Sequence, residues 1–144
     1  MKKNVSLHTR MQLLLCVSCA LCTTMLHATI TIIESSSQLE KEITSKPLLA
    51  VLEFYGSWCH VCQSIQKPFE AIADEAEFKD KVFFAQIDID AHKDLKTKYG
   101  VLGVPTFIYF EKGKKKQQDM GVHNLADFKN ELRASIKKHF KLGK

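Results

Sequence analysis

Residues 47–62 read "PLLAVLEFYGSWCHVC", and this stretch decides the fold. Its first nine residues are a nearly unbroken apolar run of strand length, which is typical of a strand buried on both faces of a sheet. Two cysteines separated by two residues follow, and from Cys59 onward apolar residues recur every three or four positions, which predicts one face of a helix. The apolar positions of this helix are Cys62, Ile65, Phe69, Ile72 and Ala76. The cysteine pair is therefore expected at a strand-to-helix junction, with Cys59 in the first turn.

Strands and helices are expected to alternate along the rest of the chain. The expected strands are residues 29–33, 47–55, 81–90, 106–110 and 116–120, and the expected helices are 35–44, 59–76, 94–99 and a C-terminal helix from 125. The apolar face of the last helix is expected to carry Leu125, Phe128, Leu132 and Ile136. Pro68 interrupts the hydrogen-bond pattern of its helix, so we expect a kink there.

This alternation predicts an α/β fold with a mixed central sheet of about five strands and helices on both faces. Strands joined through helices are expected to pair in parallel with right-handed crossovers, and a turn at Lys112-Gly113 is expected to add one antiparallel pair. The second strand is expected at the centre of the sheet. Its carboxyl end leads into the cysteines, and reaction sites in open α/β sheets collect at the carboxyl ends of strands.

The first 28 residues resemble a secretory signal peptide more than part of this domain. Lys2, Lys3 and Arg10 make a basic start, an apolar run extends from Met11 to Leu26, and Ala28 offers a small residue for cleavage. An uncleaved membrane anchor or a lipid-modified cysteine remain alternatives, although a bilayer span asks for about 20 apolar residues. We expect a signal peptide over 1–28 and one domain over 29–144.

The charge balance argues against a nucleic-acid partner. The whole chain carries a formal net charge of +5, but three of its 21 basic residues and none of its 16 acidic ones lie in 1–28. The remaining chain has 18 basic and 16 acidic residues, a net charge of +2. It shows no basic stripe interleaved with aromatic residues, and Lys114, Lys115 and Lys116 are interpreted as a solvated turn.

The cysteine pair could in principle bind a metal, staple the fold or exchange electrons. A staple is nearly excluded, because a loop this short removes little entropy from the unfolded chain. A zinc site needs four ligands, and beyond the cysteines only histidines without a suitable spacing are available. These histidines are His60, His92, His123 and His139. No metal is expected, and redox chemistry is favoured.

Three segments together resemble the thioredoxin superfamily over essentially all of residues 29–140. They are "WCHVC" after the buried strand, "YGVLGVPTF" some forty residues later, and "MGVHNLADF" before the last helix. A pair of cysteines two residues apart is ambiguous alone, but at a strand-to-helix junction with Val-Pro-Thr ahead of a strand it is specific. The resemblance implies a thioredoxin-like fold and a thiol-disulfide oxidoreductase with no cofactor.

The two cysteines are expected to have different roles. Backbone N–H groups and the positive end of the helix dipole lower the pKa of a cysteine thiol at a helix N-terminus, and only a thiolate attacks a disulfide. Cys59 is therefore the expected nucleophile. Cys62, one turn deeper, is expected to be less accessible and to resolve the mixed disulfide by attacking Cys59.

Glu53 interrupts the buried strand, where an ionised carboxylate is costly unless it is satisfied. We expect a raised pKa and a proton-relay role with Cys62, since the resemblance places a buried aspartate at the matching position. A carboxylate that escapes to solvent is the alternative. Gln86 departs from the family, in which many members carry a lysine near that carboxylate.

The resemblance also implies a substrate-binding surface. Trp58 is expected to be a partly exposed platform beside the nucleophile, and Pro105 a cis-proline opposite the cysteines. The backbone of Val104 would then pair with an extended substrate, and Gly121 would let a partner approach closely. His60 either stabilises the thiolate when protonated, which makes the disulfide more oxidising, or is simply solvated.

These expectations converge on an exported bacterial oxidoreductase. We expect a periplasmic monomer, or one anchored to the membrane and facing the periplasm. It would pass electrons from a membrane thiol reductase to protein disulfides, since about 116 residues leave no room for the extra domains of oxidising or isomerising relatives. An oxidising disulfide donor, a non-catalytic binding module and a metallochaperone remain alternatives.

Overall fold

The computed structural model describes residues 30–45 and 49–142 and contains a five-stranded mixed sheet with helices on both faces. The strands are β1 (Thr31–Ile32), β2 (Leu49–Tyr55), β3 (Val82–Asp88), β4 (Thr106–Glu111) and β5 (Lys114–Met120), in the order β1-β3-β2-β4-β5. The helices are α2 (Ser36–Ser45), α3 (His60–Ala73), α4 (Lys93–Tyr99) and α5 (Phe128–Phe140), the last preceded by a 3-10 turn at Leu125–Asp127. This is the predicted fold class.

The predicted signal peptide lies outside the described residues, as does Thr29 at the start of the predicted domain. Within 30–45 and 49–142 no helix combines the length and the apolar character needed to cross a bilayer.

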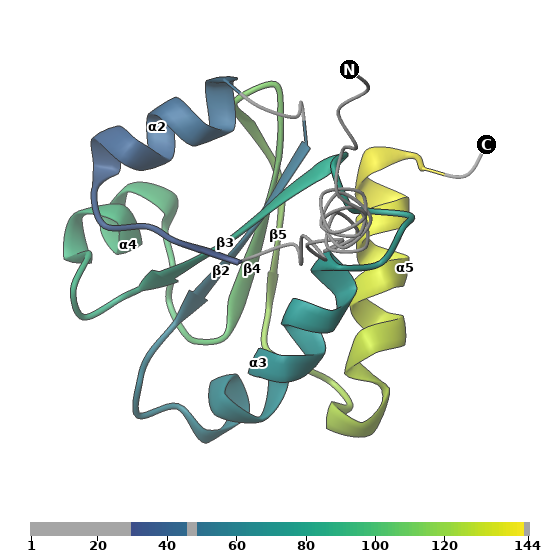
Figure 1. The fold of residues 1–144 in the computed structure, drawn as a ribbon. Coiled ribbons are helices and arrows are strands. Elements are labelled where there is room, and N and C mark those ends of the chain that lie inside the picture. Colours follow the sequence, from purple (N-terminus) through teal and green to yellow (C-terminus); the bar gives the residue numbers. More distant parts are fainter. Residues whose placement is uncertain (1–29, 46–48, 143–144) are drawn as a thin grey trace, which may run out of the picture.

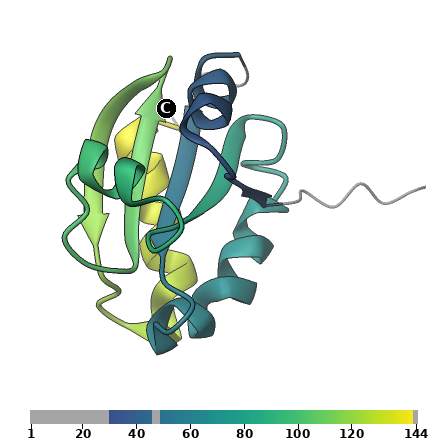
Figure 2. The same cartoon turned by 90° about the vertical axis from the view of Figure 1, so that its left-hand side faces the viewer.

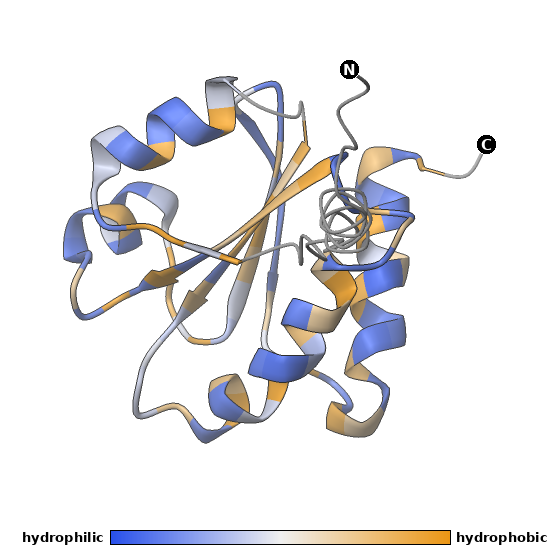
Figure 3. Cartoon of the chain, viewed as in Figure 1, coloured by the Kyte–Doolittle hydropathy of each residue, from blue (hydrophilic) through white to orange (hydrophobic). Residues whose placement is uncertain are grey.

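The sheet separates two apolar layers. Figure 1 shows α2 and α4 on one side of the sheet and α3 and α5 on the other, and Figure 2 looks onto the face covered by α2 and α4. Apolar residues concentrate on the strands β2, β3 and β4, whereas β5 and much of the helices are hydrophilic (Figure 3). Phe69 of α3 and Leu132 of α5 belong to one buried cluster, and Leu39 of α2 and Leu95 of α4 belong to the other.

The strand β2 lies at the centre of the sheet, as predicted, and contributes to both layers. Because side chains alternate along a strand, Val51 joins the cluster under α3 and α5, whereas Leu52 and Phe54 join the cluster under α2 and α4. Glu53 is two residues from Val51 and so faces α3. This period places the one acidic residue of β2 on the same side of the sheet as the cysteine-bearing helix.

The predicted strand directions were wrong for β4. It runs antiparallel to β2 as well as to β5, with Phe54 opposite Thr106 and Leu49 opposite Glu111. The sheet thus has two antiparallel pairs, not one. The seven residues of α4 span roughly 10 Å, too little to carry the chain back along a strand of about 23 Å. The chain therefore begins β4 beside the carboxyl end of β2 and runs back antiparallel to it.

Several element boundaries also differ from the sequence prediction, and three of these differences change which residues are buried or paired. The helix α3 continues through Pro68 but ends at Ala73, so Ala76 is exposed in the following turn and not part of the apolar face. Leu125 belongs to the 3-10 turn and is 50% exposed, and the buried face of α5 begins at Phe128. The edge strand β5 begins at Lys114 because Lys112 and Gly113 alone form the turn, both with positive φ.

Candidate active site

The cysteine pair caps the N-terminus of α3. Cys59 is the N-cap residue, and the two residues form a disulfide with their Cα atoms 5.2 Å apart. The backbone N–H of Cys62 donates to Sγ of Cys59 at 3.2 Å. The unpaired end of the helix thus directs a donor at this sulfur, which stabilises negative charge there once the disulfide is reduced. Cys59 is 7% exposed and Cys62 is 4% exposed, so both are largely buried in the oxidised state.

Glu53 is fully buried beneath this pair and is hydrogen-bonded to the neighbouring strand. Gln86 of β3 is its register partner and donates from Nε2 to Oε2 of Glu53 at 2.7 Å. Burial raises the pKa of Glu53 to about 7, and the hydrogen bond from Gln86 opposes this rise only in part. The carboxylate has not escaped to solvent.

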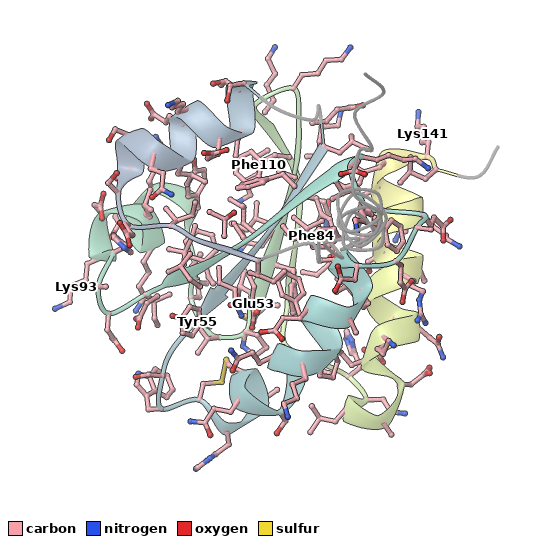
Figure 4. The ribbon with its side chains drawn as sticks, in the orientation of Figure 1. Glu53, Tyr55, Phe84, Lys93, Phe110 and Lys141 are labelled. Atoms are coloured by element: carbon pink, nitrogen blue, oxygen red, sulfur yellow. A yellow bond between two sulfur atoms is a disulfide. The ribbon has the colours of Figure 1, made fainter. Side chains whose placement is uncertain are left out.

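A cavity of about 250 Å³ lies between Glu53 and Cys62. Its wall contains Glu53, Gln86 and Cys62. Oε1 of Glu53 is buried and has no hydrogen-bond partner. Figure 4 shows the disulfide at the end of α3, with Glu53 and Tyr55 on the adjoining end of the sheet. A cavity of this size with carboxyl and amide groups in its wall has room for water, which could carry a proton between the carboxyl group and Cys62.

The loop before β4 lies against the sulfur of Cys59. The Val104–Pro105 peptide bond is cis, and the carbonyl oxygen of Val104 lies 3.9 Å from Sγ of Cys59. Pro105 is buried. The N–H of Gly121, which has φ of +81°, donates to the carbonyl oxygen of Pro105 at 2.8 Å. Gly121 therefore lies beside the Val104–Pro105 segment. Apart from its two chain neighbours, no atom lies within 4 Å of the position that a Cβ on Gly121 would take.

Trp58 is 61% exposed next to Cys59, and its indole N–H donates to Oδ2 of Asp90 at 2.7 Å. Its ring lies over Gly56, where an added Cβ would come within 2.8 Å of the indole. Asp90 was not predicted from the sequence. A usable signal existed, because Asp90 follows β3 and the carboxyl ends of the parallel strands β2 and β3 meet at one edge.

Several exposed side chains belong to the segments that meet at Cys59, namely the start of α3 and the loop before β4. His60, the first residue of α3, is exposed there, and so is its neighbour Val61. Leu102, in the loop before β4, is 89% exposed, and Met120 at the end of β5 is 59% exposed. A Cβ added at Gly103 would lie 3.3 Å from Sδ of Met120. Neither Leu102 nor Met120 was singled out from the sequence, since an isolated apolar residue in a loop has no periodicity to mark it.

Within 30–45 and 49–142, no group of three histidine, cysteine or acidic residues is placed to hold a metal ion. A second cavity, of about 520 Å³, lies between β5 and α5 and contains neither cysteine. Of the residues predicted from the sequence, Glu53 and Cys62 meet at the smaller cavity. Val104 meets Cys59 at the surface, next to Pro105 and Gly121.

Comparisons with known proteins agree with this geometry. Residues 30–136 match the thioredoxin family model. A thioredoxin of Malassezia sympodialis is 32% identical over 105 residues, which cover 73% of this chain and 94% of that protein. The rice protein disulfide isomerase-like 2-2 is 42% identical over 79 residues, which cover 54% of this chain and 21% of that protein. The chain thus spans about a fifth of the disulfide isomerases that it matches.

Solved structures give the same result. The thioredoxin of Fasciola hepatica superposes with a TM-score of 0.67 at 31% identity, covering 76% of this chain and 99% of that one. The Malassezia sympodialis thioredoxin superposes with a TM-score of 0.65 at 30% identity, covering 76% and 92%. With a disulfide at the N-terminus of α3 beside a buried carboxyl group, the chain belongs to the thioredoxin family.

Proposed function

We propose that the protein reduces disulfides in other proteins through Cys59 and Cys62. The observation that carries the proposal is the position of Cys59 as the N-cap of α3, with the N–H of Cys62 directed at its sulfur. A thiolate there is stabilised and ready to attack. Trp58, Leu102 and Met120 are large exposed apolar side chains, and their exposure supports a polypeptide substrate over a small polar one.

The chemistry has two thiol-exchange steps. In the first, the Cys59 thiolate attacks one sulfur of the substrate disulfide, and the other substrate sulfur leaves as a thiolate. In the second, Cys62 gives its proton to the Glu53 carboxylate and attacks Sγ of Cys59, which expels the second substrate thiolate. The substrate disulfide becomes two thiols, and Cys59 and Cys62 become a disulfide. An external dithiol must then reduce the protein, and a membrane thiol reductase is the donor class that we propose.

The location is part of the proposal. The basic start and apolar run of 1–28 support export, and we propose a monomer that acts in the bacterial periplasm. Cell fractionation and N-terminal sequencing test this. A mature chain beginning at Thr29 supports it, and a cytoplasmic protein that retains Met1 contradicts it.

The catalytic roles are tested by two single substitutions in an insulin-reduction assay. Cys59→Ser should abolish turnover, because it removes the attacking sulfur. Cys62→Ser should stop turnover after the first step and leave a substrate bound to Cys59, visible by mass spectrometry. The alkylation rate of Cys59 at pH 7 should exceed that of free cysteine. Full function in Cys59→Ser would favour a non-catalytic binding module, and equal alkylation rates would remove the enzymatic interpretation.

An oxidising disulfide donor is the second candidate, favoured by the 42% identity to a protein named as a disulfide isomerase and by His60 beside the nucleophile. The chemistry is the same in reverse, so the reduction potential decides between the two. Equilibration with glutathione buffers should give a value near the reducing end of the family range, about −270 mV, for the reductase. A value near about −120 mV would assign the protein to disulfide donation.

A further inference from the structure

The Glu53 carboxyl group is held at only one of its two oxygens. Gln86 donates to Oε2 at 2.7 Å, whereas Oε1 is buried without a partner. An orphaned carboxylate oxygen in a buried position is costly, and such positions often have a functional reason. Both side chains line the 250 Å³ cavity together with Cys62.

We propose that Gln86 is a positioning residue: it anchors Oε2 of Glu53 and thereby presents Oε1 to the Cys62 side of the cavity. The inference rests on the function proposed above, because it concerns the proton that leaves Cys62. Gln86 is 6% exposed and stands opposite Glu53 in the β2–β3 register, so its amide has little freedom to turn elsewhere. Gln86 touches no reacting sulfur and acts only through Glu53.

The neutral amide has a second consequence. A cation at this position would hold Glu53 ionised, whereas an amide stabilises the carboxylate less and lets the carboxyl group exchange a proton near neutral pH. A carboxylate is needed to accept the proton of Cys62, and a carboxylic acid is needed to return a proton when the reaction reverses. Gln86 therefore leaves both directions of proton transfer open.

The other titratable groups around Glu53 do not replace this control. Cys62 faces it from α3, Tyr55 lies two residues along β2, and Asp88 lies at the end of β3. Burial, with Asp88 and Glu53 contributing, raises the pKa of Tyr55. From β4 the register partner of Glu53 is the uncharged Phe107. No lysine or arginine is among the described residues that line the cavity.

The test is the pH profile of the second step, followed in single turnovers as Cys62 resolves a mixed disulfide on the full chain. Gln86→Met keeps the length of the side chain but removes the hydrogen bond, so the carboxyl group holds its proton to higher pH. The acid limb should shift upward, and the rate at pH 7 should fall severalfold. Gln86→Lys supplies a cation, and the acid limb should shift downward by about one pH unit or more.

Gln66→Leu is the matched control, because Gln66 lines the same cavity but no hydrogen bond joins it to Glu53. It should keep the wild-type profile. Difference infrared spectroscopy of the Glu53 carboxyl group gives a readout apart from turnover and should show the same opposite shifts in the two Gln86 variants. Unchanged midpoints in both variants would overturn the role of Gln86 while the redox function stands. A wild-type protein without any thiol exchange would instead overturn the proposed function.

Discussion

Glu53 is a buried carboxyl group whose loss of hydration is only partly compensated by hydrogen bonding. The loss of water raises its pKa to about 7, and the one hydrogen bond from Gln86 recovers only part of the solvation. The folded state thus binds a proton that the unfolded chain releases near pH 4.5. Keeping a carboxyl group here lowers the stability of the fold at neutral pH, and under the proposed mechanism it supplies a proton acceptor next to Cys62.

The oxidised protein should therefore lose stability as the pH rises. A raised folded-state pKa contributes stability that is full below pH 4.5 and lost as the pH rises through 7. Between pH 4.5 and 8 the loss is about 3 kcal/mol in the free energy of unfolding. Glu53→Gln, which does not titrate, should lack this slope. The measurement is the free energy of unfolding in urea of both proteins across this pH range. If it depends on pH in the same way in both, Glu53 does not have a raised pKa.

At the level of elements, α5 shows how the packing of a helix decides which of its residues matter. Arg133 of α5 forms a two-pronged ion pair with Glu75, with nitrogen–oxygen distances of 2.6 and 2.7 Å, and so ties α5 to the turn after α3. This contact lowers the pKa of Glu75, with the hydrogen bond from Arg133 as the largest cause. The apolar face of α5 packs against the sheet beside α3.

A matched pair of leucines tests where this apolar face begins. Leu132 is 3% exposed, whereas Leu125 is 50% exposed in the preceding 3-10 turn. Leu132→Ala should cost about 2–5 kcal/mol of unfolding free energy, because it leaves a cavity against the sheet. Leu125→Ala should cost about 0.5 kcal/mol or less. Denaturant unfolding measures both losses of unfolding free energy. Equal losses would mean that Leu125 is part of the buried face.

Across the whole molecule, one sheet serves two apolar layers. In the central strand β2, Val51 packs in one layer and Leu52 in the other. Neither layer can therefore unfold without disturbing the strand that both share. Small domains with shared cores of this kind unfold in one cooperative step. The active site benefits, because the end of β2 that leads into Cys59 is held from both faces.

Substitutions in the two layers should therefore weaken the same unfolding transition. Phe69→Ala removes a ring that packs against Phe84 and Phe107, with centroids 5.6 and 5.9 Å away, and Leu39→Ala empties a site in the opposite layer. Each should cost about 2–5 kcal/mol. Fluorescence of Trp58, the only tryptophan of the chain, and far-UV circular dichroism should report one midpoint in each variant. Two separated midpoints would mean that the layers unfold independently.

Some of the active site could be read from local sequence because local spacing creates it. The strand-length apolar run before Gly56 and the helical period after Cys59 place the two cysteines at a junction whatever the rest of the chain does. The helix was correctly predicted to continue through Pro68, since the apolar period continues on both sides of it. The predicted burial of Leu125 was wrong, because helical spacing does not tell whether the sheet extends far enough to cover the residue.

By itself, the sequence determined the α/β class, the central strand and the position of the cysteine pair, since backbone propensities and side-chain periods act over a few residues. Only the tertiary structure decided the direction of β4, the indole contact of Trp58 with Asp90 and the hydrogen bond from Gln86 to Oε2 of Glu53. These depend on which strands become neighbours and in what register. The partners lie more than thirty residues apart, where no local pattern links them.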